Sequence, residues 1–336
     1  MTKGILAVII AHHQDRCPDD VLKVATTPVI MPSGPVERGV LMMSTGLVKV
    51  ILDYDGTLTA EEQQVGELAE RSIGTLSQEI LKVPLSQVRD DYYHTRAMLL
   101  AQPHKYWWEV NGGIASYSDE GAFITNTTTV QIMLRINPSY AQAVEQYFGE
   151  VEYDPIVDCS NYLFHKHTFD LEPHFREPTE RVLGELMAHP RLEPIILSSS
   201  KGDKVRKNMR VLGLEQIRVL GDTRQYEIDP SWGRQFAHPE QGEGQIFRVD
   251  EEHTIDLRRP AYYNALAKEM RDAEKLVVAA DTFSMPGALP MMMGIPFLLL
   301  KTGYTPAWCE AYVGAHPHGE VLPDLGLLPE RVEALI

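Results

Sequence analysis

The stretch VKVILDYDGTLTAEE, residues 48–62, constrains the fold more than any other part of the sequence. Its first five residues are mostly apolar and β-branched, which is typical of a strand buried in a parallel sheet. The strand ends at Asp53 and Asp55, and Gly56 follows directly. Asp followed by Gly is also common in plain turns. Two like charges at the end of an apolar strand lose hydration and repel each other, however, which favours a site that binds a cation.

The second half of the chain alternates apolar strands with amphipathic helices. Strands are predicted at 194–200, 217–222, 274–282 and 295–303, and helices at 177–190, 201–214 and 259–273. Such alternation indicates βαβ units and a parallel sheet. The predicted fold class is therefore α/β, a doubly wound, Rossmann-like parallel sheet. A polar segment at 222–257 interrupts the alternation, and its pieces QYEID and QIFRVD are compatible with a hairpin.

The region between the first and second predicted strands has helical periodicity. Helices are predicted at 61–82, 86–102 and 138–151, whereas TNTTTVQIMLRI at 125–136 is compatible with either a strand or a helix. We therefore expect a core made of residues 48–60 and 176–336, with a mainly helical domain inserted at 61–175. Residues 1–47 are rich in Pro, Gly and Thr and are predicted to be an N-terminal extension, unless translation starts at Met42 or Met43.

Composition narrows the possible partners and location. The formal charge of -16 disfavours a nucleic-acid partner, because an acidic surface repels phosphate backbones. The longest apolar runs, at 4–11 and 295–300, are far shorter than the ~20 residues that cross a bilayer. Three widely spaced cysteines indicate neither a disulfide framework nor a zinc site. We expect a cytoplasmic protein that has no nucleic-acid or membrane partner.

Three predicted strands end in residues with reactive side chains. Asp53 and Asp55 end the first, Ser198 the second and Asp281 a later one. Ligands of open parallel sheets bind outside the carboxyl ends of the strands, where these side chains would meet. Mg²⁺ is bound by one or two carboxylates together with water and substrate phosphate. The pattern predicts a magnesium site that serves phosphate chemistry.

The segment DYDGTL at 53–58 resembles motif I of the haloacid dehalogenase superfamily, whose phosphatases carry DxDGT after an apolar strand. The resemblance extends over residues 48–336. It implies that Asp53 is the nucleophile that becomes phosphorylated and that Asp55 is the general acid and base. It also implies that Gly56 and Thr57, in the same motif, lie at the phosphate site.

The resemblance continues in motifs II and III. The segment IILSSS resembles motif II and implies that Ser198, with Ser199 beside it, binds the phosphoryl group. Motif III is a basic residue, often before a proline and a helix, and RRPAYYNAL places Arg259 there. Such a cation offsets the negative charges of phosphate and nucleophile. Lower-ranked candidates for the same role are Lys201, Lys204 and Lys268.

Motif IV matches less closely. KLVVAADTFSMPGALP keeps the apolar strand and Asp281, but Ala280 precedes the acid and Met285 stands where a second acid is common. The implied magnesium ligands are Asp53, Asp55 and Asp281.

The resemblance implies Mg²⁺-dependent hydrolysis of a small phosphorylated metabolite, a phosphate monoester, through an aspartyl-phosphate. The insert corresponds to a C1-type cap that closes over the site and selects the substrate. Two alternatives remain, a sugar-phosphate mutase of the same fold and a non-catalytic binding protein.

Two further segments have more than one interpretation. HKH at 165–167 would place two histidines on one face of a strand, as a metal pair or as ordinary surface residues. YWW at 106–108 is predicted to pack in the core of the insert or to line the substrate pocket.

Overall fold

The computed structural model describes residues 46–149, 151–238 and 240–336. The chain divides into a unit of residues 1–43 and a unit of residues 44–336, and the description below concerns the second unit. The predictions for the N-terminal extension and for a start at Met42 or Met43 lie outside the described residues. In the described part, none of the helices is both long and apolar enough to cross a bilayer.

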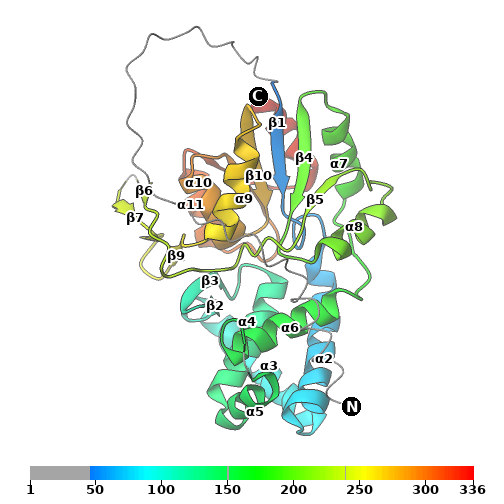
Figure 1. The fold of residues 1–336 in the computed structure, drawn as a ribbon, viewed down its shortest axis with the longest axis vertical. Helices are drawn as coiled ribbons and strands as arrows, with labels where there is room; N and C mark the ends of the chain where they lie inside the picture. Colours follow the sequence, from blue (N-terminus) through cyan, green and yellow to red (C-terminus); the bar gives the residue numbers. More distant parts are fainter. Residues whose placement is uncertain (1–45, 150, 239) are drawn as a thin grey trace, which may run out of the picture. The chain divides into compact units, whose positions relative to one another are not determined.

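A six-stranded parallel sheet forms the centre of the fold, in the order β12-β11-β10-β1-β4-β5 (Figure 1). The first strand along the chain, β1, therefore lies in the middle, between β10 and β4. This confirms the predicted doubly wound α/β fold class. The strands are β1 (Val48–Leu52), β4 (Leu192–Leu197), β5 (Arg218–Leu220), β10 (Lys275–Ala280), β11 (Phe297–Leu300) and β12 (Gly319–Leu322).

Helices cover both faces of the sheet, because successive strand residues point to opposite sides. Val50 and Leu52 of β1 pack with one set of helices, and Ile51 packs with the other. In Figure 1 the first set lies to the right of the sheet and the second to the left. The first set is α7 (Thr179–Ala188), α8 (Gly202–Val211) and α12 (Leu328–Ala334), and the second is α9 (Pro260–Met270), α10 (Ala288–Met292) and α11 (Ala307–Ala315).

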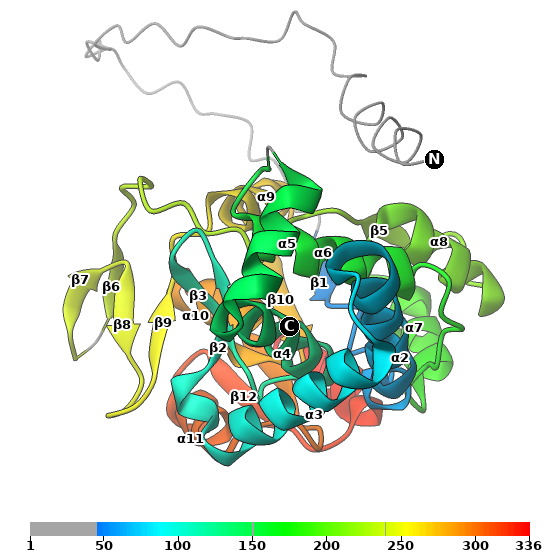
Figure 2. The same cartoon turned by 90° about the horizontal axis from the view of Figure 1, so that it is seen from below.

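Residues 61–168, between β1 and α7, form a mainly helical segment, the insert. It lies beyond the carboxyl ends of the strands, at the bottom of Figure 1 and toward the viewer in Figure 2. Its helices pack around a hydrophobic core of their own. The insert contains α2 (Val65–Thr75), α3 (Leu85–Ala101), α4 (Ala122–Ile136), α5 (Pro138–Phe148), α6 (Pro155–Thr168) and a hairpin of β2 (Trp107–Val110) and β3 (Gly113–Tyr117).

The structure of two segments of the insert answers questions raised by the sequence. One segment was compatible with a strand or a helix, and the other was predicted to be a strand. TNTTTVQIMLRI is helical throughout, within α4, and most of that helix is buried. HKH lies in α6, so the prediction of two histidines on one face of a strand is wrong. His167 contacts Thr75 through its Nε2 (2.9 Å from Oγ1), while His165 lines a pocket. Asp154 caps α6 by accepting hydrogen bonds from the first backbone N–H groups of the helix, which sets where it begins.

The polar segment after β5 forms two small hairpins, and only one half of the predicted hairpin is correct. QIFRVD supplies β8 (Ile246–Arg248), but its partner is β9 (Thr254–Asp256), and QYEID is not a strand. Asp229 ends QYEID in a turn, where its Oδ1 accepts from the Ser231 N–H at 2.8 Å. The other hairpin pairs β6 (Phe236–His238) with β7 (Gly242–Gly244). Short helical turns complete the fold: Glu61–Gln63, Leu76–Leu81, Pro103–Lys105, Phe283–Gly287 and Leu325–Leu327.

Candidate active site

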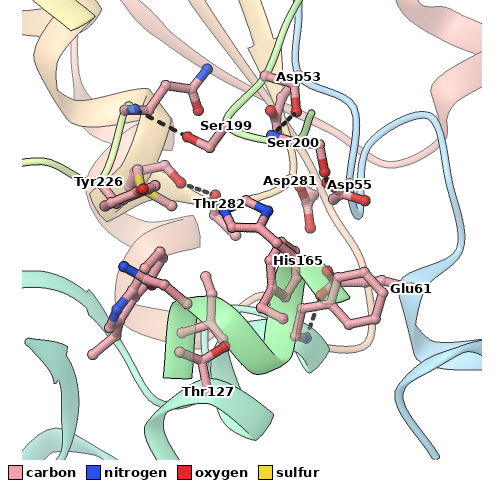
Figure 3. Close-up of a pocket in the computed structure, with 18 residues that line it drawn as sticks. Asp53, Asp55, Glu61, Thr127, His165, Ser199, Ser200, Tyr226, Asp281 and Thr282 are labelled. Carbon is pink, nitrogen blue, oxygen red and sulfur yellow. Dashed lines mark hydrogen bonds between the residues drawn. The ribbon is translucent and has the colours of Figure 1, made fainter. Parts of the chain in front are cut away.

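The carboxyl ends of β1, β4 and β10 meet at one pocket. Asp53, Asp55 and Asp281 line it together, as the order of the strands predicts (Figure 3). The backbone N–H of Asp53 donates to the Ala279 carbonyl at 3.0 Å, which fixes the end of β1 against β10. The three acids are thus positioned by the rigid centre of the sheet.

Gly56 and Thr57 hold Asp281 in place. Thr57 Oγ1 donates to Asp281 Oδ1 at 2.9 Å and accepts from the Asp281 N–H at 3.0 Å. Gly56 has a φ of +79°, and a Cβ added there would lie 2.7 Å from Asp281 Cγ. Both residues were predicted to bind phosphate, but neither is among the residues that line the pocket. The structure instead places them behind Asp281, as the support that brings this acid to β1.

The acids of the pocket repel one another. The pKa of Asp53 is raised well above its usual value, mainly by burial and then by the charges of Asp281 and Asp55. Burial likewise raises the pKa of Asp281, which its hydrogen bond with Thr57 opposes. Each of these groups would be stabilised in its charged form by a nearby cation.

Glu61 is a fourth acid at this pocket, and the sequence analysis missed it. It lies at the start of the insert, is 6% exposed, and its Oε1 accepts from the Phe123 N–H at 3.2 Å. Its pKa is raised well above the usual value, first by burial and then by Asp281. Glu61 thereby connects the start of the insert to the N-terminus of α4, a favourable place for an anion. No signal in the sequence separates it from the neighbouring Glu62.

The donor set suits Mg²⁺, although not quite as predicted. Among the described residues, no group of three or more His, Cys, Asp or Glu side chains is arranged to hold a metal ion. Asp55 turns toward other partners, which leaves the carboxylates of Asp53 and Asp281. Mg²⁺ commonly uses one or two carboxylates together with water and substrate phosphate. Two buried acids, of which Asp281 raises the pKa of Asp53, therefore fit this ion.

The three serines after β4 also line the pocket. Ser198 Oγ accepts from the Ser200 N–H, and Ser199 Oγ accepts from the Gln225 N–H, each at 3.0 Å. Ser200, the last residue of IILSSS, donates its hydroxyl to Asp55 Oδ2. The predicted serines are thus at the pocket, and Ser200 adds a direct contact to a candidate catalytic acid.

Lys204 is the basic residue at the acidic end of the pocket. Its Nζ donates to Asp55 Oδ1 and to Ser200 Oγ, both at 3.1 Å. The side chain is nearly buried, and it projects from the first turn of α8. A buried ammonium in contact with a carboxylate and a hydroxyl is a fixed positive charge next to the site. Lys204 was one of the lower-ranked candidates for the motif III cation.

Arg259, the preferred candidate for that cation, is placed elsewhere. Its guanidinium is buried, and its N–H groups donate to four backbone carbonyls at 2.7–3.1 Å. It is not among the residues that line the pocket. Two of the carbonyls, from Ile114 and Ala115, belong to β3 of the insert. Arg259 therefore links the core to the insert, a structural position that the order of the motifs did not reveal.

The insert supplies most of the wall opposite the acids, the core adds Tyr226 and Met285, and this wall is largely apolar. Figure 3 shows Thr127 and His165 projecting from it toward the acids. Burial, with Lys201 and Lys204 nearby, lowers the pKa of His165 to about 4, so the ring is neutral at pH 7. Trp108 of the YWW segment lines the pocket and also packs in a hydrophobic cluster with residues of the insert, so both interpretations of that segment apply to it. Apolar residues of the wall are Trp108, Phe123, Ile124, Phe164, Tyr226 and Met285.

Comparison with known proteins gives matches at the level of structure only. No family model matches the sequence. No curated protein matches it significantly. Solved structures do match, among them a haloacid dehalogenase-like hydrolase from Streptococcus pneumoniae, with 13% identity and a TM-score of 0.44, covering 87% of this chain and 99% of that one.

Two further solved structures show the same level of similarity. One is described as a predicted phosphoglycolate phosphatase from Haemophilus somnus, with 13% identity and a TM-score of 0.44, covering 85% of this chain and 98% of that one. The other is a haloacid dehalogenase-type hydrolase from Bacillus subtilis described as bound to magnesium, with 11% identity and a TM-score of 0.43, covering 85% and 98%. Two of these three structures are described as haloacid dehalogenase-type hydrolases.

Proposed function

We propose that this protein is a magnesium-dependent phosphatase that hydrolyses a phosphate monoester of a small molecule, with Asp53 as the nucleophile. The observation that carries the proposal is the arrangement of Asp53, Asp55 and Asp281 at one pocket, with Lys204 bonded to Asp55. A buried carboxylate at the end of the central strand is well placed for covalent catalysis. Asp55, two residues on, has the position for proton transfer.

The reaction has two steps. An Asp53 carboxylate oxygen attacks phosphorus, the bond between phosphorus and the leaving-group oxygen breaks, and Asp55 gives that oxygen a proton. Water then attacks the phosphorus of the aspartyl-phosphate and gives a proton to Asp55. The bond between phosphorus and the Asp53 oxygen breaks, which releases inorganic phosphate and restores the Asp53 carboxylate. The hydroxyl of Ser200 and the ammonium of Lys204 donate to the ionised Asp55 carboxylate and orient it for the second step, in which it accepts the proton from water.

Positive charge is required because the nucleophile and the phosphoryl group are both anionic. Asp53 and Asp281 would hold Mg²⁺, which supplies charge neutralisation when bound. Lys204 contributes a second positive charge from the side of α8. Ser198 and Ser199 line the same part of the pocket and are the candidate donors to the phosphoryl oxygens.

The insert acts as a cap in this proposal. It covers the acids with a largely apolar wall. Arg259 links the core to it through hydrogen bonds to β3, and Glu61 bonds the start of the insert to α4. Excluding bulk water strengthens the electrostatic interactions inside the site and limits access to the aspartyl-phosphate.

The test is phosphate release from a panel of phosphomonoesters by the purified full chain with Mg²⁺. We expect activity that chelation with EDTA abolishes and that Asp53→Asn lowers by at least ~10³-fold. The matched control is Asp203→Asn, an exposed aspartate on α8 that should change nothing. An isomerised sugar phosphate in place of free phosphate would indicate a mutase. No turnover and no Mg²⁺ binding would indicate a non-catalytic protein.

A further inference from the structure

We propose that the phosphate ester has a neutral, mainly apolar leaving group, and that the pocket discriminates against leaving groups that carry a carboxylate or a second phosphate. This inference rests on the phosphatase function proposed above and specifies the class of substrate. It follows from the side chains that face the acids across the pocket, and these come from three elements of the insert and two loops of the core.

The wall opposite the acids contains two aromatic pairs. The rings of Trp108 and Tyr226 lie 5.0 Å apart between centroids and are tilted by 35°. Those of Phe123 and Phe164 lie 5.6 Å apart, edge to face. Trp108 and Tyr226 pack with Ile124 in one hydrophobic cluster, against which Met285 is placed. A leaving group that extends from the phosphate toward the insert would therefore contact apolar surface, and it would be favoured if it is apolar itself.

The charges of the pocket also favour a neutral leaving group. Among the described residues that line it, four are carboxylates and none is Lys or Arg. The pKa of His165 is lowered to about 4, so the one histidine of the wall is uncharged at pH 7. The nearest lysines are already paired, Lys204 with Asp55 and Lys201 with Asp222. An anionic leaving group would lose its hydration without gaining a cation, and it would lie close to Glu61.

One donor on the wall has no acceptor. The indole Nε1 of Trp108 is buried and has no hydrogen-bond partner among the described residues, although the side chain lines the pocket. A buried unsatisfied N–H is unfavourable. An apolar leaving group that packs against Trp108 therefore takes no hydrogen bond away from this indole.

The experiment compares esters whose alcohols have similar intrinsic reactivity. The four substrates are ethyl phosphate, 2-phenylethyl phosphate, and the derivatives of 2-phenylethyl phosphate with a carboxylate or an aminomethyl group at the para position. We expect kcat/KM for 2-phenylethyl phosphate to exceed those for ethyl phosphate and for the carboxylate by about tenfold or more. Equal values, or a preference for the carboxylate, would overturn the inference. So would a tenfold preference for the aminomethyl compound, which would show that the pocket selects a cation.

A charge introduced into the wall tests the cause. Thr127 of α4 lines the pocket, and Thr127→Lys should raise kcat/KM for the carboxylate relative to 2-phenylethyl phosphate by about tenfold. Thr127→Met has similar length without charge and should leave that ratio unchanged. If thermal unfolding shows that Thr127→Lys does not fold, the pair Asn161→Lys and Asn161→Met on α6 makes the same comparison. A ratio that the added charge does not alter would contradict the inference.

The two proposals fail in different ways. If the wild-type chain releases no phosphate from any substrate, the proposed function is wrong. If it releases phosphate in an Asp53-dependent way but does not prefer 2-phenylethyl phosphate, the function stands and the inference about the leaving group is wrong.

Discussion

Gly56 and Asp281 lie so close together that residue 56 has no room for a side chain. A Cβ at residue 56 would lie 2.7 Å from Asp281 Cγ and 2.8 Å from its Oδ1, and the φ of +79° is itself unfavourable for other residues. The glycine therefore allows the ends of β1 and β10 to approach until their acids share a pocket. This contact joins motif I, which contains Gly56, to motif IV, which contains Asp281. The two residues are 225 positions apart in the sequence (281 minus 56).

Gly56→Ala should displace the Asp281 carboxylate and reduce activity more than stability. We expect a loss of at least ~100-fold in kcat/KM, because misplaced catalytic groups lose their alignment. The loss of unfolding free energy should be about 1–3 kcal/mol, from backbone strain and the steric clash. Phosphatase assays and urea unfolding measure the two quantities.

The matched control is Gly74→Ala. Gly74 lies in α2, and nothing lies within 4 Å of a Cβ added there. In a helix the substitution should stabilise the protein by about 0.5–1 kcal/mol and leave kcat/KM unchanged. Unchanged activity in Gly56→Ala would show that the position of Asp281 is not required.

Lys204→Met should lower activity while the fold remains intact. The substitution keeps the apolar stem of the side chain but removes the charge that contacts Asp55 and Ser200. We expect kcat to fall by about 10²–10³-fold, as for removal of one fixed electrostatic group. Lys207→Met, at an exposed position of the same helix, is the control and should retain full activity. If Lys204→Met lowered kcat only slightly, another cation would have to stabilise the phosphoryl group.

Arg259→Met should destabilise the protein, because four buried carbonyls lose their donor at once. The unfolding free energy should fall by about 3 kcal/mol, since each unsatisfied buried acceptor is costly. The remaining folded protein should still release phosphate at 20 °C or below. Activity lost in full, with an unchanged melting temperature, would instead place Arg259 at the phosphate, as its position in motif III implied.

His165 gives a pH dependence of stability with a definite sign. Burial lowers the pKa of His165 to about 4 from 6.5, so below pH 6.5 the unfolded chain binds a proton that the folded chain does not. The unfolding free energy should therefore fall as the pH is lowered from 6.5 to 4, by about 2 kcal/mol from this group. His165→Asn should remove that part of the slope in urea titrations, whereas His94→Asn at an exposed site should not. An identical slope in His165→Asn would contradict the assignment.

The sheet and the meeting of its acids were predictable because both depend on local pattern. An apolar run that ends in Asp or Ser identifies a strand and its carboxyl end, and parallel strands bring such ends together. The helical state of α4 was not decidable, since its threonines favour strands and only burial against the other helices of the insert selects the helix.

The basic residue of the site was misjudged for a related reason. Order along the chain favoured Arg259, but its guanidinium binds Ala115 O, which lies 144 residues away. Lys204 is brought to Asp55 by the direction in which α8 leaves the sheet, across 149 residues. Glu61 likewise becomes part of the site only through contact with α4. The positions of these three residues result from packing between distant parts of the chain, which the order of the motifs does not predict.

The central claim is that Asp53 becomes phosphorylated, and acid quenching followed by mass spectrometry tests it most directly. The wild-type chain and Asp55→Asn, in which breakdown of the intermediate should be slow, are mixed with Mg²⁺ and a phosphomonoester that the wild type hydrolyses. The proposed mechanism predicts a gain of about 80 Da, the mass of HPO₃, on the peptide that contains Asp53. Borohydride reduction should convert the phosphorylated Asp53 to homoserine. Hydrolysis that proceeds while Asp53 stays unmodified in both proteins would contradict it.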